Sequence, residues 1–176
     1  MFVSMYDLSV PVFLRGLEIV DEYCDKAIEF AAKNGVDPSA FLNARLAPDM
    51  LPLIGQVQCV SDGSKLPVGR LAGITPPMFE DNEKTFQDLK LRLHKTAAFL
   101  EGISPAQLAG SDEREISAKI FGKEFRNSKE YLLTIALPHF YFHVATTHDI
   151  LRHCGVPLGK RDYLFLPKEI RVAIGE

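Results

Sequence analysis

Apolar residues spaced three and four apart are the feature that most constrains the fold of this chain. From residue 10 to residue 31 they form one continuous stripe, and Gly35 follows it as the expected helix end. Such spacing places side chains on one face of an α-helix. The same spacing recurs at about residues 46–71, where Pro48 and Pro52 disturb the first turns, and at residues 86–100. The sequence therefore predicts three amphipathic helices in its first hundred residues.

After residue 110 the spacing of apolar residues changes. Between residues 116 and 120 apolar and polar side chains alternate, which is typical of a strand, and Gly122 can turn the chain back into a second strand. Asn127, with Glu130 three residues later, has the pattern of a helix N-cap. We expect the helix that begins there to run to Gly155, a residue suited to a left-handed helix end.

Four long helices that are each apolar on one side must bury those sides against one another. The expected fold class is therefore all-α, a four-helix bundle with a small β-hairpin before the last long helix. We expect a single helical-bundle domain over residues 1–164. Residues 165–176 form a C-terminal tail that has no evident place in the bundle.

Charge and cysteine content exclude several classes of protein. The chain carries 20 basic and 23 acidic residues, a net charge of -3, and no basic run that could follow a phosphate backbone, so nucleic acid is not an expected partner. Its three distant cysteines indicate neither a disulfide framework nor a zinc ribbon, and the N-terminus does not resemble a signal peptide. The longest apolar stretch, residues 131–145, is too short to span a membrane. A cytoplasmic protein without a membrane partner is expected.

Four of the five histidines lie within residues 139–153, in the predicted last helix. At about 100° per residue, His139 and His143 fall on its apolar side. A pair one turn apart can bring two imidazoles to one metal ion. Pro138 cannot donate to the carbonyl of Thr134, so the helix can open beside the pair. The spacing alone leaves two interpretations open, a metal pair or two hydrogen-bonded core histidines.

A metal site would need a third ligand, and the second predicted helix offers Asp49 and Gln56. These residues are seven positions apart and fall within about 20° of each other at the edge of the apolar face. A carboxylate with two histidines is an accepted ligand set for iron, zinc or manganese, whereas a glutamine is the better hydrogen-bond partner. Asp49 can equally serve the helix start, or pair with Arg45. No motif identifies a catalytic residue.

These residues belong to longer segments that resemble one bacterial family. The segments are SMYDLSVPVFLRGL (4–17), NARLAPDMLPL (43–53), FEDNEKTFQDL (79–89) and LPHFYFHVATTHDILRHCGVPLGKRDYL (137–164). Together they look like the family known as domain of unknown function 1993, over about residues 4–164. That family is placed in the DinB/YfiT-like superfamily of four-helix bundles. Many superfamily members resemble metal-dependent enzymes such as thiol-dependent transferases and maleylpyruvate isomerase.

The resemblance implies a DinB-like four-helix bundle and a homodimer, because superfamily members commonly pair through helices. It also implies a metal pattern of one histidine from the second helix and an H-x-x-x-H pair from the last. His139 and His143 match the pair, but the second helix has no histidine. Either Asp49 replaces it in a site for a divalent metal (zinc, nickel, iron or manganese), or the metal is lost and a polar pocket persists.

Two functions follow as hypotheses, and both involve an unknown small molecule or a partner subunit. In the first, the protein is a divalent-metal-dependent enzyme, similar to a transferase, isomerase or hydrolase, with a polar pocket in its core. In the second, it is a non-catalytic small-ligand-binding or dimeric scaffold protein with a degenerate metal site. The predicted metal ligands are His139, His143 and Asp49, and the predicted ligand-binding residues are Arg45, Gln56 and Tyr141.

Overall fold

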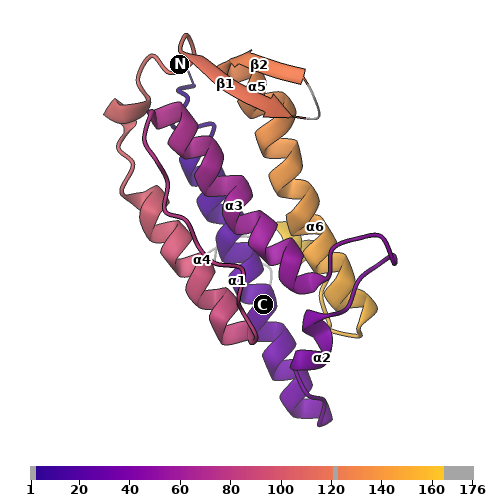
Figure 1. The fold of residues 1–176 in the computed structure, drawn as a ribbon. Helices are drawn as coiled ribbons and strands as arrows, with labels where there is room; N and C mark the ends of the chain where they lie inside the picture. Colours follow the sequence, from indigo (N-terminus) through magenta and orange to yellow (C-terminus); the bar gives the residue numbers. More distant parts are fainter. Residues whose placement is uncertain (1–2, 121–122, 165–176) are drawn as a thin grey trace.

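The computed structural model describes residues 3–120 and 123–164. Four long helices lie side by side, and a two-stranded hairpin lies at one end of them (Figure 1). The long helices are α1 (Val10–Asn34), α3 (Leu53–Ala72), α4 (Phe86–Glu101) and α6 (Leu137–His153). The shorter elements are α2 (Ser39–Leu42), a 3₁₀ turn (Pro105–Leu108), β1 (Glu115–Ile120), β2 (Lys123–Asn127), α5 (Ser128–Tyr131), the π-helical turn η2 (Leu132–Ala136) and α7 (Lys160–Leu164).

The four long helices form a closed arrangement in which each packs on two neighbours. Helix α3 packs on α4 and α6, and α1 packs on the same two helices from the other side. The apolar stripes meet in this arrangement and form one buried core. The predicted all-α bundle with a small hairpin is confirmed. Within residues 3–120 and 123–164, no helix has both the length and the apolar character needed to cross a membrane.

Helix α1 forms as the sequence predicts. Its stripe is buried from Val10 to Ala31, and Gly35 ends the helix in the left-handed conformation at φ +66°. The amide of Gly35 donates to the carbonyl of Ala31, which satisfies one of the last orphan carbonyls of the helix.

Helix α3 begins later than predicted, at Leu53 instead of near residue 46. Pro52 stands before it in an extended conformation, with φ -68° and ψ 168°. A proline also disfavours helical geometry in the residue before it, so Pro48 and Pro52 keep residues 43–52 in a loop. This loop is tied down where the amide of Leu53 donates to the carbonyl of Ala44 over 2.8 Å. Asp49 therefore lies outside the helix that carries Gln56.

The last long helix is continuous from residue 128 but contains a π-helical turn. The Asn127 side chain caps its start by accepting from the amide of Glu130 over 2.8 Å, as predicted. In η2 the amide of Leu137 donates five residues back, to the carbonyl of Leu132. Pro138 follows at once, so the predicted local opening of the helix is found, in the form of a π-helical turn.

The hairpin pairs β1 with β2 in antiparallel register, with Ala118 opposite Phe125. It lies where α3 ends and α5 begins (Figure 1). Arg114 connects it to α3 by donating to the carbonyl of Leu71 over 2.7 Å. The hairpin is confirmed; its predicted turn at Gly122 and the predicted tail over residues 165–176 lie outside the described residues.

Helix α6 approaches α1 closely at Gly16. A methyl group at this position would overlap the ring of Phe140, which also packs edge-on against Phe13 with ring centroids 4.9 Å apart. The absence of a side chain at Gly16 therefore sets the distance between the two helices.

The substitution Gly16→Ala is expected to lower the free energy of unfolding by about 1–3 kcal/mol, because the added methyl group overpacks the core. The expected sign is informative, since Gly→Ala inside a helix otherwise gains up to about 1 kcal/mol. Urea unfolding measures this change. Gly159→Ala is the matched control, because its nearest neighbour would be 3.8 Å away. Equal stability of Gly16→Ala and wild type would contradict the close approach.

Candidate functional site

His143 is buried between α3 and α6 and is held by Gln56. Its side chain is only 8% exposed, and its Nδ1 lies 2.7 Å from Oε1 of Gln56. The amide nitrogen of Gln56 donates to the carbonyl of Leu51 over 3.0 Å. The reverse orientation of the amide would set two oxygens against each other, so Oε1 must face the histidine. Nδ1 of His143 therefore carries a proton and donates it.

This hydrogen bond decides the state of the other ring nitrogen. A neutral imidazole has one donor and one acceptor, so Nε2 of His143 presents a lone pair. Burial and, to a lesser extent, the neighbouring His139 together lower the pKa of His143 from its ordinary 6.5 to about 4. His143 is therefore neutral near pH 7, with its lone pair directed at His139.

His139 lies one turn earlier on α6, exposed on one side. Its Nε2 is 3.3 Å from Nε2 of His143, and the ring centroids are 4.6 Å apart. Its Nδ1 edge faces Gly63 of α3, where an added methyl group would lie 3.1 Å away. Partial burial lowers the pKa of His139 as well. The His139 ring therefore fits against α3 because residue 63 is a glycine, and a side chain at this position would crowd the ring.

The distance between the two Nε2 atoms defines what the pair can bind. Two nitrogen ligands of a tetrahedral ion, each about 2.0–2.1 Å from the metal, lie about 3.3 Å apart. The same distance also suits a long hydrogen bond in which Nε2–H of His139 donates to His143. The arrangement can share one proton or one cation between the rings.

The predicted third ligand is not brought to this pair. Asp49 is exposed in the loop before α3, and Arg45 donates to the carbonyl of Met50 over 3.2 Å. The prediction that Asp49 and Gln56 share a helix face is wrong, because Pro52 starts the helix three residues after Asp49. In the part of the chain that the structure describes, no three His, Cys, Asp or Glu side chains group together as metal ligands.

Of the three predicted ligand-binding residues, only Gln56 contacts the histidine pair. Gln56 reaches the pair, whereas the loop that holds Arg45 turns its guanidinium to backbone carbonyls. Tyr141 is two residues from each histidine and so projects from the opposite side of α6. Its titratable neighbours are Tyr163 and Arg15, and its pKa is raised chiefly by burial. Tyr141 therefore packs towards α1 and α7 and does not line the histidine site.

A groove beside His139 was not predicted from the sequence. It has a volume of about 470 Å³ and lies between α3 and the segment from α5 to the start of α6. The residues that line it are Cys59, Asp62, Gly63, Leu66, Pro67, Arg70, Tyr131, Thr134, Ile135, Ala136, Pro138 and His139. The small residues at positions 63 and 67, one turn apart on α3, were the available signal. Burial raises the pKa of the Cys59 thiol, so it is no thiolate nucleophile near pH 7.

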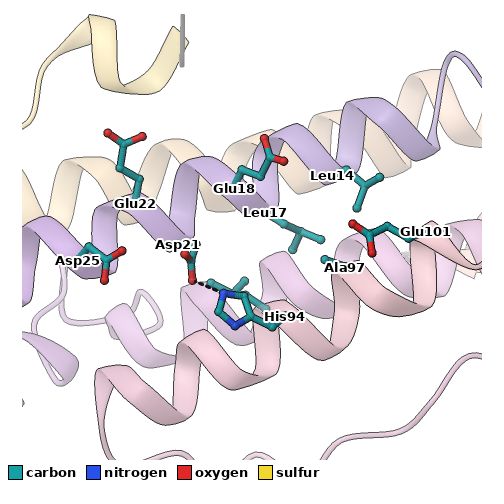
Figure 2. A pocket seen from close by; sticks show the side chains of 10 residues that line it. Leu14, Leu17, Glu18, Asp21, Glu22, Asp25, His94, Ala97 and Glu101 are labelled. Atoms are coloured by element: carbon teal, nitrogen blue, oxygen red, sulfur yellow. Dashed lines mark ion pairs between the residues drawn. The ribbon is translucent and has the colours of Figure 1, made fainter. Parts of the chain in front are cut away.

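A second pocket, of about 290 Å³, lies between α1 and α4 (Figure 2). It is lined by acidic side chains, and Asp21 is 3.0 Å from Nε2 of His94. Lys90 already pairs with Asp21 at 3.0 Å and with Asp25 at 2.6 Å. The α1–α4 pocket is therefore an ion-paired surface, and the groove at the histidines is the candidate site.

Comparisons with known proteins agree with this fold. The model of the family described as Domain of unknown function (DUF1993) matches residues 5–164. The crystal structure of a DinB family member protein from Shewanella denitrificans is similar to this chain, with a TM-score of 0.86 and 38% sequence identity. The similarity covers 93% of each chain. None of the curated proteins compared matches this chain.

The buried neutral state of His143 predicts a pH dependence of stability. Its pKa of about 4 lies below the unfolded value of 6.5, so the unfolded chain binds more protons between these values. Stability from this group is present above pH 6.5 and is lost as the pH falls towards 4. Between pH 7 and pH 4.5, wild type should lose about 2–3 kcal/mol more than His143→Asn.

Urea unfolding at the two pH values measures this difference. The control is His153→Asn, because His153 is exposed in the last turn of α6. It should lose as much stability as wild type. If His143→Asn behaves like this control, the histidine is not held in its neutral state by burial.

Proposed function

We propose that this chain, which belongs to the family described as Domain of unknown function (DUF1993), is a small-molecule-binding protein. It has the fold of a DinB family member. Its recognition group is the pair His139 and His143. The metal pattern implied by the superfamily is degenerate in this chain.

The observation that carries this proposal is the chain of two hydrogen bonds that links the Leu51 carbonyl, the Gln56 side chain and His143. It presents one imidazole lone pair in a fixed direction, beside a groove of small-molecule size. Nε2 of His143 is directed at Nε2 of His139, 3.3 Å away, and His139 lines the groove, so a ligand with an O–H or N–H group reaches the pair through His139. His139 completes the contact, since it can donate or accept at the rim.

The donor set does not fit a resident metal. Catalytic zinc sites take three protein ligands, and this pair supplies two. Gln56 of α3, which contacts the pair, already uses its oxygen to accept from His143. It orients the ring instead of adding a ligand. A metal bound here would need further ligands from the small molecule or from solvent.

One specific observation favours a second candidate, the divalent-metal-dependent enzyme expected from the sequence. The Nε2 atoms are 3.3 Å apart, the separation of two ligands on one tetrahedral ion. In that case the ion would supply Lewis-acid chemistry for a reaction similar to a transfer, isomerisation or hydrolysis. The homodimer and the cytoplasmic location stay predictions under both candidates.

Metal analysis separates the two candidates. Protein purified without a histidine tag and equilibrated with zinc, nickel, iron or manganese should retain well below one ion per chain after dialysis. The melting temperature should not rise on adding the ions, because a ligand of the native state must raise it. Near-stoichiometric metal in wild type and His153→Ala, lost in His143→Ala, would instead establish the metal-dependent candidate.

Fragment screening tests the binding function itself. Some small molecules with an O–H or N–H donor should raise the melting temperature of wild type and of His153→Asn. The same molecules should have no effect on His143→Asn, because that variant lacks the imidazole that pairs with His139. If every stabilising fragment acts equally on all three proteins, the histidine pair is not the recognition group.

A further inference from the structure

The groove beside His139 extends along α3, and one stripe of this helix lines it. This stripe runs from Cys59 to Arg70, and at about 1.5 Å per residue it extends over roughly 16 Å. The volume of about 470 Å³ lies within the usual range of small-molecule sites, about 300–1,000 Å³. The shape therefore suits an extended ligand better than a compact one.

The middle of the groove is lined by apolar residues, several of them small. Gly63 and Pro67 stand one turn apart on α3, and the π-helical turn faces them with Ile135 and Ala136. Leu66 and Ile135 are only partly buried, so their apolar surface stays exposed to a ligand. Burying apolar surface stabilises a complex by roughly 25 cal/mol per Å². This part of the groove suits a hydrocarbon body.

One end of the groove has two hydrogen-bond donors. Arg70 Nη1 donates to the hydroxyl oxygen of Tyr131 over 2.6 Å, and the guanidinium lies 5.6 Å from the centre of the Tyr131 ring. Within residues 3–120 and 123–164, no carboxylate lies within ion-pair distance of Arg70. The Arg70 side chain is exposed, so an incoming anion can reach it.

Tyr131 adds the second donor. Its side chain is 2% exposed, and burial raises its pKa, so the phenol keeps its proton near pH 7. Its oxygen accepts from Arg70, and its hydrogen has no acceptor among the described residues. A guanidinium beside an O–H donor is suited to a carboxylate, because charge-assisted hydrogen bonds are the strong ones.

The other end of the groove does not favour a second anion. Asp62 lines it, 41% exposed, and pairs with Lys65 and with Arg92 at 2.9 Å. Arg92 also pairs with Asp81 and Glu83, each at 2.9 Å. These side chains comprise three carboxylates and two cations, so this end carries no excess positive charge. A ligand with one carboxylate therefore fits better than a dicarboxylate.

We infer that the groove binds a monocarboxylic acid with a hydrocarbon body of medium length. The carboxylate lies on the Arg70 guanidinium and the Tyr131 hydroxyl, the hydrocarbon body packs on Leu66 and Ile135, and the far end of the ligand reaches His139. This inference rests on the proposed function, because it names the ligand class of the same site.

Calorimetric titration with octanoate tests the inference. Octanoate should bind wild type, and Arg70→Gln should weaken binding at least about tenfold, as expected for loss of a charge-assisted hydrogen bond. Arg70→Lys keeps the charge without the planar fork and should give an intermediate affinity. The matched control is Lys129→Gln, which removes one charge from an exposed position near Tyr131 that does not line the groove. It should bind octanoate as wild type does.

1-Octanol is the matched ligand control and should bind more weakly than octanoate. Equal affinities for the two ligands, or equal octanoate affinities in wild type and Arg70→Gln, would overturn the carboxylate assignment. So would the absence of octanoate binding to wild type. In each of these cases the proposed function would still be supported if the fragment screen finds molecules whose binding depends on His143. If the screen finds no such molecules, the proposed function fails, whatever the result with octanoate. Melting temperatures near that of wild type show that the variants are folded.

Discussion

The hydrogen bond between Gln56 and His143 is the interaction on which the site depends. Both side chains are buried, and they come from different helices, so the bond joins α3 to α6 inside the core. Leaving either partner unpaired there costs about 1–3 kcal/mol. The Gln56 amide is oriented in turn by the Leu51 carbonyl, in the loop just before α3. The direction of one histidine lone pair thus depends on where a neighbouring helix begins.

Glycines on two helices allow α6 to lie where it does. Gly16 of α1 makes room for the ring of Phe140, and Gly63 of α3 makes room for His139. His139 and Phe140 are adjacent on α6, so their side chains project about 100° apart, towards different neighbouring helices. The π-helical turn before Pro138 ends just ahead of both rings. Gly63, which permits the close packing of α6 on α3, also lines the groove beside His139.

The fold was predictable from local signals, with one informative exception. The stripe of α1, the N-cap at Asn127 and the alternation before residue 120 each specify an element through contacts within a few residues, and all three are confirmed. The predicted start of α3 was wrong, because the apolar spacing continues through a segment that two prolines keep out of the helix. Leu46 keeps the spacing of the stripe yet is 42% exposed. Periodicity alone cannot show where a helix begins.

The sequence by itself determined the bundle and the position of His139 and His143 one turn apart on one helix, because helical periodicity depends only on residues close together along the chain. The expectation that both rings face inward holds for His143, which is buried, and is wrong for His139, which is exposed. The tertiary structure decided the partners of that pair. Gln56 and His143 are 87 residues apart, and Arg70 and Tyr131 are 61 apart, so only the packing of α3 on the last helix brings them together. It also excluded Asp49, since a side chain seven residues from Gln56 shares its face only if one helix carries both.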